Sequence, residues 1–572
     1  MSSPIVYWFT SEVYPWRTTA ATCWAMLSVP VFSIAFVLLT GISFSHPVQW
    51  ISDTAGVMIS SQFFTSVLVF ALLLALVTRF SFSHYSVIAD IEKTRLNSVL
   101  SLFRWSRLPL LVVSFVTGAV SSWSLLRLMG SDMGSLTYEL DSKEFRKVML
   151  NERHLFLVEA GVFFSLCHFV RFFWQKQNYL SFPHIQRQKF FLIRREASRI
   201  LHSNAGLSVK NTLCFYAVYF LFGGGPKLWI KSSFNMNEDS SKSDLTSVLG
   251  LLDISLFWQT YVLSLILTTA WTLATSLLRV FHTQLLQFDI QSAMEAKQDR
   301  GLGDAMATSE PQLLQHLAFY DFCLLSRHSK QRRQELFSLS QPGGHPRVWM
   351  AVSRTALHIA RELTLKIQDA NRLIMSRVAV AGQNQMANEE VSKSPFLFSS
   401  NLDSDGANSK GDPSNNNQTE AQASHSLSKI KATLSSLPFI TQLTAENPDT
   451  DSRCLFASCQ MHMWAVEGLS QVASWSFTED KYGVVQGFLP TLIYTLVDLN
   501  EAIEKHFKCT SVVRRSHAAS EDVPDASLPH RLHSVTRTAI YRVVNTYRQH
   551  LHDLHLSPEY FKKVQMFSDF LL

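Results

Sequence analysis

Hydrophobic residues are distributed unevenly along this chain. From Thr18 to Leu278 long uncharged stretches recur, whereas from Arg279 to Leu572 a charged residue appears every few positions. A bilayer core is crossed by about 20 predominantly apolar helical residues. The pattern therefore predicts a polytopic membrane domain over residues 1–278, followed by a soluble domain.

Six stretches approach the length of a membrane-spanning helix, at residues 18–44, 57–78, 108–126, 155–173, 211–226 and 254–278. Two of them are weaker than the others. The segment 155–173 carries Glu159, His168 and Arg171, and the segment 211–226 is short and glycine-rich at its end. We expect six transmembrane helices, with re-entrant or peripheral helices as the alternative for these two segments.

The placement of Lys and Arg predicts the orientation of these helices. Cytoplasmic loops retain positive charge, and the loops after the second and fourth predicted spans carry five and seven Lys or Arg residues, against none in residues 45–56. We therefore expect both termini on the cytosolic or pore side. Of the seven cysteines, none falls in a predicted lumenal loop, so no disulfide framework is expected.

Overall composition agrees with a membrane protein. The chain is 47% hydrophobic, and its mean hydropathy of +0.08 is high for a wholly soluble chain with 17% charged residues.

The fourth loop mixes aromatic and cationic residues. Such mixtures suit the interface with anionic lipids, so we predict lipid contact for four basic residues, which are Arg187, Lys189, Arg194 and Arg195. A basic loop that only sets the topology is the alternative. The segment 281–294 is a second candidate for a helix lying on the membrane, with a simple connector as its alternative.

The soluble half contains one stretch with almost nothing to bury. Residues 379–425 are rich in Ser, Asn, Gln, Asp and Gly, which predicts a disordered polar linker. Apolar residues recur every three or four positions on both sides of it. We therefore expect an all-α soluble domain in two parts, at residues 279–378 and 426–572.

A helical corner is predicted at residues 332–349, whose sequence is RRQELFSLSQPGGHPRVW. A helix should run through Arg332 and Arg333 and end at Pro342, Gly343 and Gly344. Pro346 then suits the first turn of the next helix. The basic face formed by Arg332 and Arg333 is predicted to meet lipid headgroups or a partner, with a solvated face as the alternative.

A second corner is predicted beyond the linker. Ser476 and Glu479 have the spacing of a capping box, so one helix should end near Trp475 and another begin toward Val484. Trp464 is interpreted as a core residue first and an interface anchor second.

Known catalytic patterns are missing from the sequence. It contains no zinc-protease, nucleophile-elbow, P-loop or dinucleotide motif, and Cys454 and Cys459 lack a second ligand pair. We expect no enzyme activity, cofactor, nucleic acid or small-molecule substrate. A transporter is the rival function, but Glu159 and His168 lie half a helical rotation apart, and Arg127 is placed to pair with Glu159.

Four runs carry a resemblance to a known family. They are the corner at residues 332–349, QMHMWAVEGLSQVASWSFTEDKYGVVQ at 460–486, SHPVQWISD at 45–53 and TAIYRV at 538–543. Together they resemble the nuclear division cycle transmembrane nucleoporins of the animal type, nearly from end to end. The resemblance implies six membrane spans, a helical C-terminal domain and a role in anchoring the nuclear pore complex in the pore membrane and inserting new pores. It also implies other scaffold nucleoporins as partners, including aladin and the linker nucleoporin with an RNA-recognition-like domain.

Overall fold

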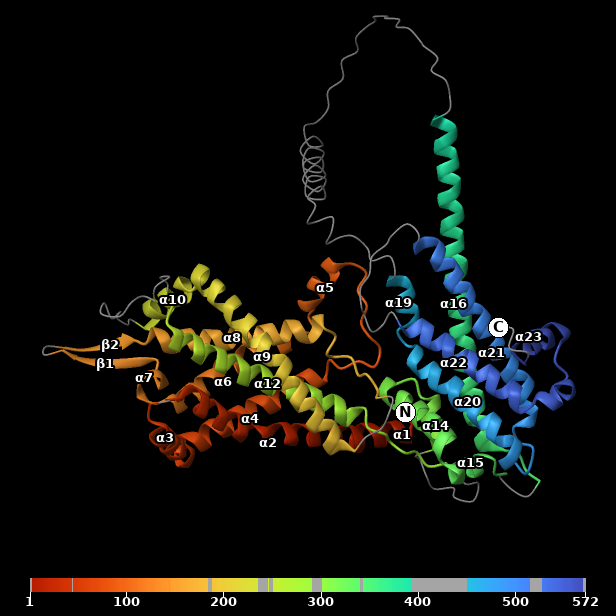
Figure 1. The fold of residues 1–572 in the computed structure, drawn as a ribbon, viewed down its shortest axis with the longest axis horizontal. Coiled ribbons are helices and arrows are strands. Elements are labelled where there is room, and N and C mark those ends of the chain that lie inside the picture. The colour runs from red at the N-terminus through yellow and green to blue at the C-terminus, as the bar shows by residue number, and fades with distance from the viewer. Residues whose placement is uncertain are drawn as a thin grey trace, which may run out of the picture. The chain divides into compact units, whose positions relative to one another are not determined.

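The computed structural model describes residues 3–43, 45–142, 145–183, 188–234, 245, 250, 252–290, 301–339, 343–392, 450–514 and 527–568. Within these residues the chain is almost entirely helical (Figure 1). It divides into two compact units. Unit 1 comprises Met1–Asp90, Ser101–Phe288 and Thr308–Ala318, and unit 2 comprises Ile91–Leu100, Asp289–Ala307 and Phe319–Leu572.

Long apolar helices form the body of unit 1, and they are α2 (Tyr14–Thr40), α4 (Ser61–Phe82), α6 (Leu108–Leu126), α8 (Glu152–Trp174), α9 (Lys189–Phe222) and α12 (Ile254–His282). Six helical stretches built on them are long and apolar enough to cross a membrane, which confirms the prediction. The first stretch begins at Pro4, because α1 (Pro4–Trp8) and η1 (Phe9–Val13) lead directly into α2. The segment 155–173 lies within the 23-residue helix α8. Of the segment 211–226, residues 211–222 lie within the 34-residue helix α9, which ends at Phe222.

Helix α12 lies at the centre of unit 1. It packs against α2, α4, α8 and α9, and 78% of its most apolar window is buried, against 22% for α9. A helix that is apolar all round belongs in an interior. The ends of these helices follow local rules, since Asp253 caps α12 and Asn151 caps α8 through their side-chain oxygens.

Shorter elements complete the first half of the chain, and they are α3 (Pro47–Ile59), α5 (Arg95–Leu102), η2 (Arg127–Met129), α7 (Ser131–Gly134), β1 (Thr137–Ser142), β2 (Phe145–Leu150) and α10 (Gly224–Phe234). The antiparallel β1–β2 hairpin, with Thr137 opposite Leu150, is the one named sheet in the described residues. The sequence pattern did not predict these strands. The alternation is incomplete, because β2 ends in three consecutive apolar residues, Val148, Met149 and Leu150.

The second half of the chain is helical, with α13 (Leu302–Ala307), α14 (Gln312–His328), α15 (Lys330–Leu336), α16 (Arg347–Ser392), α19 (Thr450–Phe456), α20 (Cys459–Glu479), η3 (Gln486–Phe488), α21 (Leu489–Arg514), α22 (Leu528–Thr546), η5 (Arg548–Leu554) and α23 (Pro558–Ser568). Helix α20 packs against α22 and α16, and α21 packs against α16 and α22. These four helices form the core of unit 2.

Two predicted segments differ from the structure. Helix α16 continues to Ser392, so the predicted linker start at residue 379 falls inside it. Ala, Gln, Met and Glu at residues 379–392 are good helix formers, which explains the extension. The rest of the predicted linker lies outside the described residues. Helix α12 ends at His282 and residues 283–290 are not helical, so the predicted membrane-surface helix at 281–294 is wrong there; residues 291–294 are not described.

Candidate functional site: the motif junction and the loop clamp

The two runs that carry the strongest family resemblance meet in unit 2. Arg333 of α15 reaches Glu479 at the end of α20, 146 residues away in the sequence. Its Nε lies 2.9 Å from Glu479 Oε2, and its Nη2 lies 2.8 Å from Oε1. This is the parallel, two-bond geometry that makes Arg–carboxylate pairs strong and directional. We call Arg332, Arg333, Asp321, Trp475 and Glu479 the motif junction.

The pair of Arg333 and Glu479 is buried, with only 5% and 7% of the two side chains exposed. Arg333 Nη1 donates to the carbonyl of Ser326 at 3.1 Å, and the guanidinium lies 4.7 Å from the Trp475 ring centroid. Every nitrogen of this guanidinium therefore has a partner. The solvated-face interpretation is wrong for Arg333, because its charge is committed to an internal contact.

The neighbouring Arg332 makes a separate pair. Its Nη1 and Nη2 each lie 2.7 Å from one oxygen of Asp321, which is buried in α14. Burial alone would lower the pKa of Arg332, but the hydrogen bond and charge of Asp321 outweigh it and raise that pKa. The predicted single helix through residue 336 is broken at Ser329, whose hydroxyl caps α15 by accepting from the Arg332 amide.

The predicted capping box at Ser476 is also wrong. Helix α20 runs through Ser476 to Glu479, and the Ser476 hydroxyl bonds to the Tyr547 hydroxyl at 2.8 Å and the Ala473 carbonyl at 2.7 Å. Asp480 instead organises the turn, since its carboxylate accepts from the amides of Tyr482 and Val485. Residues three apart are neighbours on any helix surface. The spacing of Ser476 and Glu479 therefore fits the interior of a helix as well as its start.

The predicted corner at residues 342–346 is partly described. Gly343 has φ +79°, a left-handed conformation that favours glycine, although a Cβ there would meet nothing within 4 Å. Pro346 directly precedes α16, and its carbonyl accepts from the Met350 amide at 2.9 Å. Gly344 lies between these two residues, and Pro342 lies outside the described residues. The constraint at Gly343 is therefore one of backbone conformation and not of space.

Trp464 is a core residue of unit 2. Its side chain is buried, and its ring centroid lies 4.9 Å from that of Tyr320 in α14. One helical turn further along α20, Gly468 lies against the Phe322 ring, so closely that a Cβ there would displace it. Arg327 and Glu467 form a further ion pair across the same contact. Helix α14, which precedes the first motif run, thus packs against α20 of the second run.

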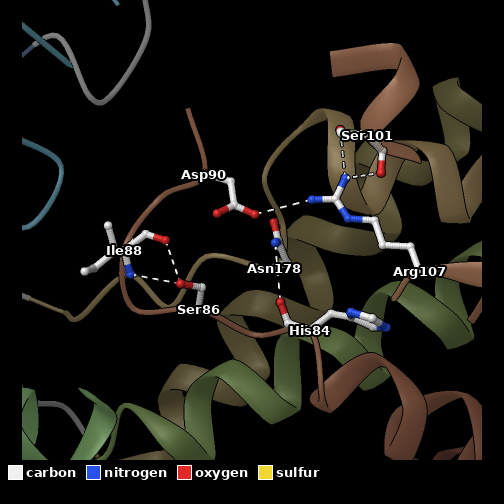
Figure 2. Close-up of polar contacts among 7 residues, drawn as sticks. All are labelled: His84, Ser86, Ile88, Asp90, Ser101, Arg107 and Asn178. Atoms are coloured by element: carbon white, nitrogen blue, oxygen red, sulfur yellow. Dashed lines mark hydrogen bonds and ion pairs between the residues drawn. The ribbon is translucent and has the colours of Figure 1, made fainter. Parts of the chain in front are cut away.

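In unit 1 a second cluster, the loop clamp, ties together the connectors around α4, α6 and α8. Arg107, the residue before α6, donates to the Ser101 carbonyl at 3.0 Å, the Ser101 hydroxyl at 2.9 Å and Asp90 Oδ2 at 3.3 Å (Figure 2). Its buried guanidinium lies 4.3 Å from the Phe173 ring centroid at the end of α8. In the sequence, Arg107 is one of five basic residues in the loop after the second predicted span, and nothing nearby marks its partners.

Backbone pairing completes the loop clamp. The Ser86 amide donates to the Asn178 carbonyl and the Leu180 amide donates to the Ser86 carbonyl, each at 3.0 Å. The Asn178 side chain donates to the His84 carbonyl at 3.4 Å (Figure 2). Burial and the nearby charge of Arg107 lower the pKa of His84. The clamp fixes the two connectors relative to one another and has no catalytic geometry.

The basic stretch predicted as a loop is helical, because α9 begins at Lys189. Arg194 and Arg195 are exposed on its first turns, as are Phe190 and Phe191. Lys189 Nζ lies 5.1 Å from the Phe281 ring centroid. Arg187 lies outside the described residues. Exposed aromatic and cationic residues lie close together at the start of this helix. Contact of these residues with lipid stays a prediction.

The polar residues behind the transporter alternative do not form a relay. Arg127 lies over the Trp123 ring at 5.1 Å, and no hydrogen bond or ion pair in the described part of the chain links it to Glu159, contrary to the expected pair. His168 is buried beside Trp271, with ring centroids 5.8 Å apart.

Comparisons with known proteins agree with this architecture. Residues 12–565 match the family described as "Nucleoporin protein Ndc1-Nup". The chain is 28% identical to nucleoporin NDC1 of Mus musculus over 98% of this chain and 97% of that protein. It is 28% identical to nucleoporin NDC1 of Xenopus laevis over 98% of both chains, and 28% identical to the Homo sapiens protein over 98% and 97%.

The family match covers both units and therefore both the apolar bundle and the motif junction. These relatives give no support to the transporter alternative. With its helices of membrane-spanning length, the chain is a transmembrane nucleoporin that belongs to the Ndc1-Nup family.

Proposed function

We propose that this chain anchors the nuclear pore scaffold in the pore membrane and supports the assembly and insertion of new pores. The observation that supports this most is the division into one unit of membrane-length helices and one helical unit with its own core. The first unit provides attachment to the bilayer. The second provides a surface for protein contacts.

The motif junction gives this second unit a defined shape. Two Arg–carboxylate pairs join α14, α15 and α20, and the buried pair of Arg333 and Glu479 does so across 146 residues of sequence. Such pairs are directional, so they favour one arrangement of the helices over others of similar hydrophobic burial. A scaffold-binding surface needs that fixed arrangement. We therefore assign the junction a structural role, and no catalytic one, in the proposed function.

Orientation follows from the number of spans and from charge. An even number of crossings places both termini on the same side. The connectors that hold Arg107 and the basic start of α9 are the positively charged ones, so we place them and both termini on the cytosolic or pore side. As partners we propose other scaffold nucleoporins, with aladin and the linker nucleoporin with an RNA-recognition-like domain suggested by the family resemblance. We assign no residue to either contact.

Localisation combined with proximity labelling tests the proposal. A labelling enzyme fused to the C-terminus of the full chain should give a punctate nuclear rim and should label scaffold nucleoporins. The same enzyme fused to an unrelated multi-span protein of the endoplasmic reticulum is the matched control. A rim signal equal to that control, without enrichment of nucleoporins, would overturn the proposed function.

A further inference from the structure

The connector between the first two membrane-length helices contains an unusual helix, α3. It ends at Ile59, and Ser60 is both the C-cap of α3 and the N-cap of α4. The Ser60 hydroxyl accepts from the Phe63 amide at 3.2 Å. At its other end α3 follows closely on Thr40, the last residue of α2. Both ends of α3 are therefore held where membrane-length helices begin and end.

Two tryptophans donate hydrogen bonds to neighbouring carbonyls at the end of α2, so their indole rings lie at a similar depth along the bundle. Trp50 of α3 donates its indole N–H to the Leu38 carbonyl at 3.1 Å, and Trp258 of α12 donates to the Leu39 carbonyl at 2.7 Å. The last carbonyls of a helix have no partner inside that helix. Tryptophan is enriched where a bilayer meets water. These bonds place α3 at the depth of the interface.

The residues of α3 separate into three faces. Successive residues of a helix are about 100° apart, which places Trp50, Thr54 and Val57 together on a buried or half-buried face, with the half-buried Met58 at its edge. Gln49 and Asp53 form an exposed polar face.

The third face of α3 is apolar and exposed. Val48, Ile51 and Ile59 are 80%, 59% and 80% exposed, although their side chains are purely hydrocarbon. Helical spacing puts them within a single sector, between the buried face and the polar face. A helix with one face on protein, one apolar face and one polar face has the pattern of a helix lying in a membrane surface.

Lipid is the occupant that fits this face best. Directly beyond Ser60, α4 exposes Phe64, Leu68 and Leu72, residues that a membrane-spanning helix presents to acyl chains. The exposed apolar residues of α3 thus continue a surface that lipid already covers. Residues 41–60 contain no Lys or Arg, and Asp53 is their one acidic residue. Attraction to anionic headgroups therefore cannot drive the contact, and burial of hydrocarbon must.

We propose that α3 lies in the plane of the membrane interface, with Val48, Ile51 and Ile59 inserted among lipid acyl chains. It binds electrically neutral phospholipid through apolar contact and adds a wedge of side chains to one leaflet beside the spanning bundle. This surface contact is independent of the proposed anchoring role, because it concerns lipid and not nucleoporins.

Site-specific photo-crosslinking tests the proposal on the full chain in nanodiscs of phosphatidylcholine. The photoreactive residue benzoylphenylalanine is introduced at Val48, Ile51 or Ile59, and at Gln49 or Asp53 as matched controls on the polar face. Mass spectrometry then counts phosphatidylcholine adducts. We expect several-fold more lipid adducts at the apolar positions, unchanged in high salt and unchanged when anionic lipid is added.

Three outcomes would overturn the proposal. Equal adducts at both sets of positions would mean that α3 does not lie on the membrane. Cross-links to a second copy of the chain would mean that the apolar face is a protein contact. Adducts that appear only with anionic lipid would contradict binding by apolar burial. Each variant is first checked by size-exclusion chromatography, so that a misfolded chain is not counted.

Discussion

The adjacent residues Arg332 and Arg333 form ion pairs with different carboxylates. Arg332 pairs with Asp321 and Arg333 pairs with Glu479, because neighbouring residues on a helix point about 100° apart. In the sequence the two look like one basic patch. Only the packing of α14 and α20 around α15 shows that both charges are neutralised inside unit 2.

Removing one partner of the Arg333–Glu479 pair should destabilise unit 2 strongly. An unpaired charge would remain buried, which typically costs about 3 to 5 kcal/mol. We expect Arg333→Gln and Glu479→Gln each to cause a large loss, and the double variant to lose less than the sum of the two. Urea-induced unfolding of the full chain in detergent, followed by hydrogen exchange in α15 and α20, measures this.

Arg372→Gln is the matched control for that experiment. Arg372 and Asp369 form an ion pair with 78% and 68% of their side chains exposed, and exposed pairs contribute little to stability. If Arg333→Gln behaved like Arg372→Gln, the motif junction would not be an important stabilising contact.

A buried histidine in unit 2 predicts a pH dependence. His506 Nδ1 lies 2.8 Å from Asn371 Oδ1, and its Nε2 lies 2.9 Å from the Ser452 hydroxyl. The Asn371 side-chain nitrogen donates to the Ala502 carbonyl, so its oxygen is the acceptor, and the neutral ring carries its proton on Nδ1. Burial lowers the pKa of His506 below its ordinary value.

Unit 2 should therefore lose stability on acidification. A histidine with a lowered pKa in the folded state stabilises that state above its ordinary pKa of about 6.5, and the contribution falls as the pH drops below that value. We expect exchange protection of α21 to decrease between pH 7 and pH 5, and His506→Gln to show a shallower decrease. Equal slopes would exclude His506 as the cause.

At the scale of elements, the crossing of α6 and α8 depends on two glycines. A Cβ at Gly161 would lie 2.8 Å from the Gly118 carbonyl oxygen, and a Cβ at Gly118 would lie 2.6 Å from the Gly161 carbonyl oxygen. Ser122 and Ser165 fill the remaining space at this contact. Small residues let helix backbones approach closely in membranes, where the contact is made by packing alone.

Gly161→Ala should disturb this crossing. The added methyl group has no room without a shift of α6, and overpacking of this kind costs about 1 to 3 kcal/mol. Gly206→Ala in α9 is the control, because a Cβ there would meet nothing within 4 Å. We expect thermal unfolding in detergent at a lower temperature for the first variant and not for the second. An unchanged melting temperature for Gly161→Ala would mean that the helices adjust freely.

Sequence patterns predicted the apolar helices but not the contacts between elements. The length of uncharged stretches is a local property, so the spans around residues 57–78 and 254–278 could be recognised directly. Glu479 could not be assigned correctly, because its partner Arg333 is distant in sequence and its spacing from Ser476 also fits a helix start. Arg107 likewise looked like one loop charge among several.

At the scale of the whole molecule, the chain combines two ways of burying polar groups. The bundle of unit 1 satisfies many of its hydroxyls locally, as Thr272 and Thr275 do by bonding back to carbonyls one turn earlier in α12. Charged side chains are instead paired between different segments in both units, as Arg107 is with Asp90 in unit 1 and Arg333 is with Glu479 in unit 2. A local bond satisfies a hydroxyl as soon as its own helix forms, whereas an ion pair between segments forms only when the segments pack together.

The proposed topology makes a prediction for the whole chain. Six crossings with positively charged connectors on the cytosolic side leave the β1–β2 hairpin and α3 on the lumenal side of the membrane. A protease-cleavable tag at either terminus should be cut when only the plasma membrane is permeabilised. The same tag inserted between Ser142 and Phe145 should stay intact until the nuclear envelope is also opened, because the bilayer shields it. The hairpin is a better insertion point than residues 45–56, since a tag there would interrupt α3. Cleavage of the hairpin tag under the milder treatment would contradict this topology. If both terminal tags were then protected, the orientation would be reversed; if only one were protected, the number of crossings would be odd.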